Sequence, residues 1–225
     1  MGSIAAQKCW RVLKNAQTVI AIELLTSAQA IDFHAPLQCG KGTQAKLLVD
    51  KLDRFGMRHL ETGQVLRDLI KKTENPTTAR ARQILKEGGF VPWWFAVYTW
   101  LRVFIEEGAI AHNLIFDGSP RKVLEAGLLD DVLDWHGRPL SICVYINVGY
   151  DECKKRLMLR KRVDDKPQAI INRLAAFEAD VVPVIKYFQE KGRLLEVNGE
   201  QNPEKVQEEL VYKLKEKLEN LWPIK

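Results

Sequence analysis

The stretch that decides the fold is Cys39-Gly40-Lys41-Gly42-Thr43-Gln44. It follows an expected short strand at residues 30–34 and begins an amphipathic helix that carries apolar Ala45, Leu48 and Leu52. Backbone N–H groups at a helix N-terminus point at whatever lies in front of them, and the helix dipole favours anions there. The lysine of this stretch adds a positive charge that can reach a β- or γ-phosphate. The stretch therefore predicts a phosphate cradle, and ATP is its expected ligand.

The match to the usual phosphate-loop pattern, G-x-x-x-x-G-K-[ST], is imperfect. Ala35 stands where the first glycine belongs, and Gly42 follows the lysine. If the first position needs a positive φ, alanine there costs about 1–2 kcal/mol. Taken alone, the motif does not separate a phosphate site from an ordinary strand-to-helix turn, so the rest of the chain must decide.

Length and composition indicate an ordinary globular protein. The chain has 225 residues, enough for one domain with a buried core, with 46% hydrophobic and 28% charged residues. The net charge of +5 suits a polyphosphate site but is too weak and scattered to indicate nucleic acid, and no basic tail is present. We expect no nucleic-acid partner.

Cysteine usage and hydropathy bear on location. Cys9, Cys39, Cys143 and Cys153 form no C-x-x-C pair, which predicts neither a zinc site nor a disulfide framework and favours a reducing cytoplasm. No run reaches transmembrane length, so we expect no membrane contact. Residues 1–22 faintly resemble a targeting peptide. Glu23 interrupts its apolar part, and we prefer an extension packed on the domain.

Hydrophobic periodicity and turn residues predict alternating strands and helices. The predicted helices are residues 41–55, 61–70, 79–87, 93–107, 122–136, 151–162, 168–191 with a bend at Pro183, and 203–221. The predicted strands are residues 30–34, 57–60, 114–116, 141–148 and 193–197. This alternation predicts an α/β fold with a parallel sheet covered on both faces, whose ligands lie at the carboxyl ends of the strands. Thr43, Thr62, Asp117 and Arg121 fall there.

With these residues in view, the chain resembles the adenylate kinase family of nucleoside monophosphate kinases, in its short-lid form. The resemblance runs from about Ile31 to the C-terminus. It rests on ordered blocks: Gly40-Lys41-Gly42-Thr43-Gln44; Thr62-Gly63 with Leu66-Arg67; Gly88-Gly89-Phe90-Val91-Pro92; Phe116-Asp117-Gly118-Ser119-Pro120-Arg121; Arg156-Leu157 with Arg160; Arg162 with Asp164-Asp165; and Ile171 with Arg173-Leu174. Each block is weak alone, but together and in order they are a strong signal.

The resemblance implies a P-loop three-layer fold with a five-stranded parallel sheet and helices on both faces. It divides the chain into an N-terminal extension, residues 1–29, and a nucleotide kinase domain, residues 30–225. Within that domain it implies a small helical NMP-binding insertion, residues 61–91, and a short lid, residues 156–166, without structural zinc. Closure of both segments would exclude water, because ATP hydrolysis otherwise competes with transfer.

The resemblance also implies a role for each site residue. The ATP site would comprise Gln38, Cys39, Gly40, Lys41, Gly42, Thr43, Arg156, Arg160 and Gln201. The AMP site would comprise Thr62, Arg67, Phe90, Val91, Gly118, Arg121, Glu125, Arg162 and Arg173. Catalysis would depend on Lys41, Arg121, Arg160, Arg162 and Arg173, because phosphoryl transfer needs charge neutralisation and positioning. Asp117 would hold Mg²⁺, through water.

Several residues depart from the family pattern. Leu37 and Gln38 replace the small, glycine-containing part of the phosphate loop. Glu125 replaces a glutamine that reads the acceptor adenine in the family, and a carboxylate would suit guanine, whose ring N–H and amino group are both donors. Thr62 is expected to cap its helix as well as to touch substrate, the tryptophans Trp93, Trp94 and Trp100 to pack, and the histidines to be structural.

The sequence therefore predicts an ATP:AMP phosphotransferase that depends on Mg²⁺ and acts as a cytoplasmic monomer. Two alternatives remain open. One is the same reaction with another acceptor, such as GMP. The other is a nucleotide-binding protein with little turnover, because of Ala35, Leu37 and Gln38.

Overall fold

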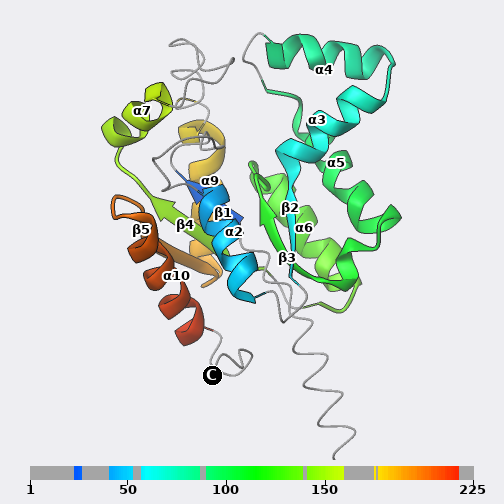
Figure 1. Ribbon diagram of the computed structural model, residues 1–225. Helices are drawn as coiled ribbons and strands as arrows, with labels where there is room; N and C mark the ends of the chain where they lie inside the picture. Colours follow the sequence, from blue (N-terminus) through cyan, green and yellow to red (C-terminus); the bar gives the residue numbers. More distant parts are fainter. Residues whose placement is uncertain are drawn as a thin grey trace, which may run out of the picture.

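Strands and helices alternate along the chain, as predicted (Figure 1). The computed structural model describes residues 23–26, 41–52, 57–86, 90–138, 141–159, 175 and 177–217. The strands are β1 (Glu23–Thr26), β2 (Met57–Glu61), β3 (Asn113–Asp117), β4 (Cys143–Asn147) and β5 (Leu194–Asn198). The helices are α2 (Lys41–Leu52), α3 (Thr62–Lys72), α4 (Pro76–Lys86), α5 (Trp93–Glu106), α6 (Val123–Trp135), α7 (Tyr150–Leu159), α9 (Val182–Glu190) and α10 (Pro203–Lys217), with a 3₁₀ turn, η2 (Ala109–Ala111), and a π-helix, η3 (Phe177–Val181).

All strand pairs are parallel, in two sheets ordered β1-β4-β5 and β2-β3. β1 also lies against β3, so the two sheets are neighbours. The predicted single five-stranded sheet is not seen: the described residues form no backbone ladder between β1 and β3. The parallel arrangement itself is confirmed.

The first strand lies earlier in the chain than predicted. β1 occupies Glu23–Thr26, whereas the predicted strand at residues 30–34 lies outside the described residues. β1 pairs with β4 from Glu23 opposite Cys143 to Thr26 opposite Ile146. Part of the segment that we assigned to an N-terminal extension therefore contributes to the central sheet.

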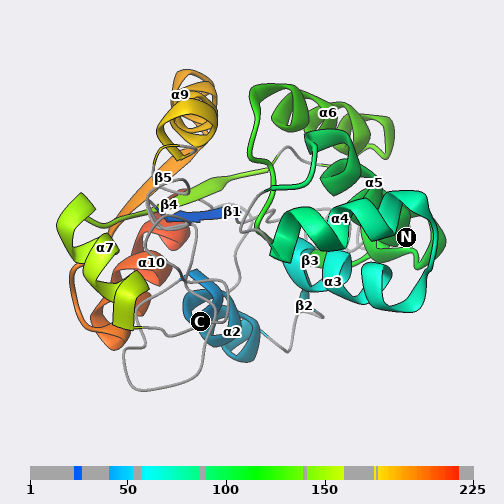
Figure 2. The same cartoon turned by 90° about the horizontal axis from the view of Figure 1, so that it is seen from above.

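Helices cover both faces of the strands because successive side chains alternate between the faces. Val144 and Ile146 of β4 pack in one cluster with apolar residues of α2 and α10, while Cys143 packs against Phe188 of α9. On the α5 and α6 side, Trp100, Phe104 and Phe116 form a buried aromatic group. Figure 2 shows α6 and α9 on one side of the strands and α2 and α10 on the other.

Two further expectations can be compared with the structure. The long helix before β5 changes from π to α geometry between Val181 and Val182, directly before Pro183, where a bend was predicted. Trp100 is fully buried, as expected, but Trp93 and Trp94 are 38% and 52% exposed and are not core residues.

Within the described ranges, no helix combines the length and apolar character needed to cross a membrane.

Candidate active site

Several of the predicted site residues lie at or just after the carboxyl ends of the parallel strands, where helices begin (Figure 1). Thr62 follows β2 directly, Asp117 ends β3, Gly149 follows β4 shortly after its end, and Gly199 follows β5. The first residue of α2, Lys41, also lies at this edge (Figure 1). Thr62, Asp117 and Arg121 lie at or just after the carboxyl ends of β2 and β3, and their sharing of a site with Thr43 of α2 stays a prediction.

The phosphate turn is described only from its helical part onward. Gln38, Cys39 and Gly40 lie outside the described residues, and Lys41 begins α2. Gly42 is buried. The Oγ1 of Thr43 is buried, and it finds no hydrogen-bond partner among the residues that the structure describes. A buried hydroxyl without a partner costs free energy, so this atom points to a ligand at the N-terminus of α2.

Thr62 is the first residue of α3 and not its cap. The N-cap is Glu61, which makes no side-chain capping bond. Thr62 is 4% exposed, and no described residue is a hydrogen-bond partner of its Oγ1. The expected capping role is therefore wrong, because α3 begins at Thr62 itself, one residue earlier than a cap at Thr62 requires. Its hydroxyl remains available to a substrate.

Asp117 is an acid buried at the carboxyl end of β3. Its side chain is 3% exposed, and its Oδ2 lies 3.6 Å from Nε2 of His59 on the adjacent strand β2. A carboxylate that is buried this deeply favours a bound cation, because an unpaired buried charge is costly. Within the described ranges, no group of three or more His, Cys, Asp or Glu side chains could hold a metal ion by itself. Asp117 therefore fits Mg²⁺ only as one oxygen ligand beside water and phosphate oxygens, which is how Mg²⁺ is usually bound.

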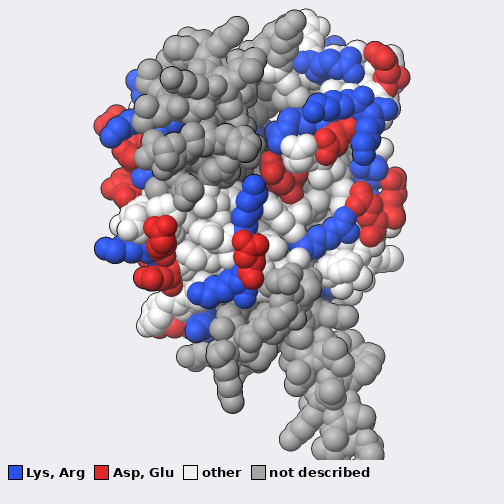
Figure 3. All heavy atoms as spheres, viewed as in Figure 1, with Lys and Arg blue, Asp and Glu red and all other residues white. Residues whose placement is uncertain are grey.

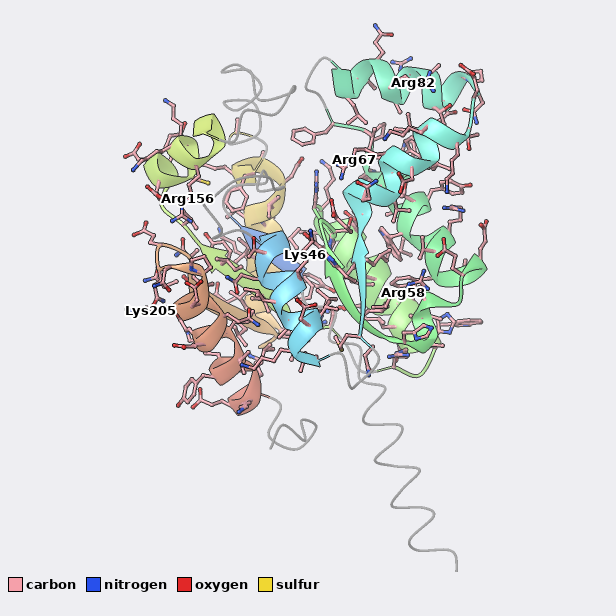
Figure 4. All side chains as sticks on the ribbon, viewed as in Figure 1. Lys46, Arg58, Arg67, Arg82, Arg156 and Lys205 are labelled. Carbon is pink, nitrogen blue, oxygen red and sulfur yellow. The ribbon has the colours of Figure 1, made fainter. Side chains whose placement is uncertain are left out.

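Arg67 reaches back from α3 to the end of β2. Its Nη2 donates to Oε1 of Glu61 at 3.0 Å and to Oε1 of Gln64 at 2.9 Å. In Figure 4, Arg67 lies beside the upper end of β2, and Arg58 lies near the opposite end of that strand. Glu61 is the register partner of Asp117, so Arg67 is held next to the end of β3 as well.

Arg121 is held in the loop between β3 and α6. Its Nε donates to the carbonyl oxygen of Gly118 at 2.8 Å, and its guanidinium carbon lies 5.9 Å from the ring centre of Phe90. Gly118 has φ 93°, a conformation that favours glycine. Ser119 is fully buried, and its Oγ has no partner. Val91 packs against the α3 and α5 cluster.

Glu125 is buried beneath this loop. It is 1% exposed, and its Oε1 accepts a hydrogen bond from Nε1 of Trp100 at 3.0 Å. Its Oε2 accepts from the backbone N–H of Arg121 at 2.7 Å. Both oxygens are therefore bonded within the protein.

Arg156 lies on α7 (Figure 4), and Gln201 lies between β5 and α10. Arg156 is nearly buried, and it donates from Nε to Oε1 of Glu152 at 2.7 Å and from Nη1 to the carbonyl oxygen of Gly199 at 3.0 Å. These bonds join α7 to the loop after β5. The hydrogen bond from Arg156 lowers the pKa of Glu152. Gln201 donates to the carbonyl oxygen of Asn198 at 3.3 Å and to Glu209.

Three predicted catalytic arginines, Arg160, Arg162 and Arg173, lie outside the described residues, so their roles stay predictions. Along α3, the basic side chains Arg67, Lys71 and Lys72 accompany one acid, Asp68, and α4 carries the basic Arg80, Arg82 and Lys86. Figure 3 shows basic and acidic side chains side by side in this part of the surface. Among the described residues, the candidate site groups therefore include two buried acids, Asp117 and Glu125, three arginines bonded to protein oxygens, Arg67, Arg121 and Arg156, and buried hydroxyls for which these residues offer no partner.

Sequence reasoning missed three partners of these groups. Glu61 bonds to Arg67 although the two residues are not three or four apart, the spacing of neighbours on a helix. His59 of β2 lies against Asp117 of the adjacent strand β3. Trp100 bonds to Glu125, 25 residues later in the sequence. The parallel register of β2 and β3 could have identified His59, but no local pattern predicts the Trp100 contact.

Comparison with known proteins agrees with this arrangement. The family model described as adenylate kinase matches residues 34–193. A second family model, aromatic amino acid lyase, matches residues 1–51, a minor part of the chain that overlaps the first match.

Similar proteins include adenylate kinase 1 of Nostoc sp., 33% identical over 178 residues, which cover 79% of this chain and 94% of the relative. The adenylate kinase of Thermus thermophilus is 33% identical, with 79% and 92% covered. The adenylate kinase of Caulobacter vibrioides is 33% identical, with 73% and 85% covered. With a family match over most of its length and relatives covered almost end to end, the chain belongs to the adenylate kinase family.

Proposed function

We propose that the protein transfers the γ-phosphoryl group of ATP to AMP, reversibly and with Mg²⁺, and yields two ADP. The proposal is supported by Arg67, which bonds to Glu61 at the end of β2, and by Asp117 and Arg121, at and shortly after the end of β3, the strand that pairs with β2. Two guanidinium groups beside a buried acid suit a phosphate that meets a metal-bound polyphosphate. Phosphoryl transfer needs little beyond such positioning and charge neutralisation.

On the acceptor side, Arg67 and Arg121 would grip the α-phosphate of AMP. The unpartnered hydroxyl of Thr62 would donate to the same nucleotide. The base would lie near Phe90 and Val91, and Gly118 would keep the backbone close to it. Arg162 and Arg173 would complete this side, by resemblance to the family.

On the donor side, the turn that includes Gln38, Cys39 and Gly40 would hold the phosphates of ATP with Lys41, Gly42 and Thr43. Arg156 would lie on the adenine face, as arginine often stacks on aromatic rings. Its bonds to Glu152 and Gly199 fix the plane of its guanidinium group. Gln201 lies in the same loop as Gly199, and Arg160 would reach the transferred phosphoryl group.

Asp117 would hold Mg²⁺ through water, and the bound ion would neutralise charge on the phosphates. No general base is needed, because the acceptor is already an anionic phosphate oxygen. Residues 61–91 and 156–166 would close over the nucleotides and exclude water. We also propose a monomer in the cytoplasm, on the composition and cysteine pattern alone.

The two alternatives are not favoured. A GMP kinase would need Glu125 to face the base, but both of its oxygens are bonded within the protein. A nucleotide-binding protein with little turnover is not favoured by the relatives, which are named adenylate kinases.

A substrate panel tests the proposal. With Mg-ATP, we expect ADP to form with AMP and much more slowly with GMP, CMP and UMP. The Lys41→Met variant should abolish turnover while the protein stays folded. Turnover only with GMP would support the first alternative, and tight ATP binding without turnover would support the second.

A further inference from the structure

The carboxylate of Glu125 has its hydrogen bonds inside the protein. It is 1% exposed and lies between the buried indole of Trp100 and the backbone of Arg121. Trp100 is itself held by edge contacts with Phe104 and Phe116 at ring-centre distances of 5.2 and 5.5 Å. The position of Glu125 is therefore set by the aromatic core and not by solvent.

An acid, and not an amide, fits this location. The Trp100 and Arg121 groups that face Glu125 are both N–H donors, and a carboxylate accepts from both because it carries no hydrogen. A glutamine would accept one of these bonds and place an NH₂ group against the other donor. A buried donor left without an acceptor is costly.

The bond to Arg121 fixes the loop that carries the phosphate-binding guanidinium group. Glu125 is the third residue of α6, and it reaches back beyond the start of the helix to the N–H of Arg121, much as the acid of a capping box does. The side chain of Arg121 is bonded in turn to the carbonyl oxygen of Gly118. The backbone and the guanidinium group of Arg121 therefore each have an anchor.

We propose that Glu125 is a positioning residue that acts through Arg121 and does not select the acceptor base. This inference rests on the proposed role of Arg121 in gripping the α-phosphate of AMP. The second carboxylate oxygen at position 125 then serves to accept the N–H of Trp100, and the acid gives no preference for guanine as the acceptor base.

The Glu125→Gln variant tests the proposal in steady-state assays of the full chain. We expect kcat/KM for AMP to fall about tenfold, with a higher KM for AMP and an unchanged KM for ATP. The ratio of AMP to GMP turnover should stay within about twofold of the wild type. Asp130→Asn is the matched control, because it also removes a buried acid of α6 but lies away from Arg121. It should lower stability without changing the KM for AMP.

A double-mutant cycle separates this proposal from the role of Arg121 itself. If Glu125 acts through Arg121, Glu125→Gln should have no further effect on AMP kinetics in an Arg121→Ala background. An equal effect in both backgrounds, or a tenfold shift from GMP towards AMP in the single variant, would overturn the proposal. Unchanged AMP kinetics in Arg121→Ala alone would instead refute the proposed role of Arg121.

A second variant keeps the test available if Glu125→Gln does not fold. Trp100→Phe removes the indole donor that holds Oε1 of Glu125 in place, which loosens the bond from the N–H of Arg121 to Oε2. We expect a smaller rise in the KM for AMP, again with an unchanged KM for ATP. An unchanged KM for AMP in this variant would contradict the proposal.

Discussion

Glu61 holds the guanidinium group of Arg67, with Oε1 of the acid 3.0 Å from Nη2 of the arginine. If Arg67 grips the phosphate of AMP, the substrate must displace this carboxylate or approach beside it. An ion pair exposed to this extent is worth about 0.2–1 kcal/mol. Glu61→Gln should therefore lower the KM for AMP by about two- to fivefold, measured with saturating Mg-ATP.

The pair of Arg58 and Glu107 is the control for this prediction. It is also exposed, but Arg58 lies near the opposite end of β2 (Figure 4). Glu107→Gln should leave the KM for AMP unchanged. If both variants lower the KM equally, the change comes from net charge and not from release of Arg67.

A methyl group at Gly118 should disturb the acceptor site through the backbone. Gly118 has φ 93°, and its carbonyl oxygen accepts the bond from Nε of Arg121. Gly118→Ala should cost about 1–2 kcal/mol of stability and raise the KM for AMP. Gly137 is the control, because it has φ 62° and an added methyl group would meet no other atom within 4 Å. Gly137→Ala should lose similar stability with unchanged kinetics, as chemical denaturation and assays can measure.

A buried ion pair away from the site joins α6 to the start of β5. Asp130 accepts bonds from Nη1 of Arg193 at 2.8 Å and from the hydroxyl of Tyr187 at 2.6 Å. Arg193 also donates to the carbonyl oxygen of Ser141 at 3.0 Å. Removing one partner of a buried pair leaves the other charge uncompensated, so Asp130→Asn should destabilise the fold by about 3 kcal/mol in urea unfolding at pH 7.

The same pair predicts how stability depends on pH. Burial, the largest effect, opposes ionisation of Asp130, but hydrogen bonds from Arg193 and Tyr187 and the nearby positive charges outweigh it, so the pKa is lowered. A carboxyl with a lowered folded pKa stabilises the protein above its unfolded pKa of about 3.9, and this stability is lost as the pH falls through the folded value. The difference between wild type and Asp130→Asn should therefore shrink below about pH 4. A difference that stays constant down to pH 2 would contradict this account.

The sequence predicts those features of the fold that are determined by neighbouring residues, such as the ends of helices and strands. Pro92 and Pro203 mark the starts of α5 and α10 within one residue, because proline fits the beginning of a helix. Asp117 was placed correctly because an acid that follows an apolar run ends a buried strand. The order of these elements was enough to predict the edge at which the site lies.

What the sequence did not predict depends on contacts between distant elements. The acid at position 125 looked like a base-reading residue until the indole of Trp100 was found against it. Thr62 looked like a helix cap, but β2, which pairs with β3 as far as Glu61, runs directly into α3, so the cap position falls on Glu61. The contact between Trp100 and Glu125 joins two helices that are distant in the sequence, and no pattern near either residue reports it.

Gly199 joins the core to the proposed ATP site, and its replacement makes the last prediction. A Cβ atom at this position would lie 2.5 Å from methyl carbons of both Ile146 and Val148, so the loop after β5 would have to move. The carbonyl oxygen of Gly199 accepts the bond from Arg156, so movement of the loop should release the guanidinium group that we place on the adenine. Gly199→Ala should cost about 1–3 kcal/mol of stability and raise the KM for ATP several-fold, with the KM for AMP unchanged. Gly127→Ala, in α6 and with open space around the new methyl group, should be neutral or slightly stabilising and kinetically silent. If Gly199→Ala raised both KM values together, the effect would be a general loss of folded structure, and the link from this loop through Arg156 to ATP would fail.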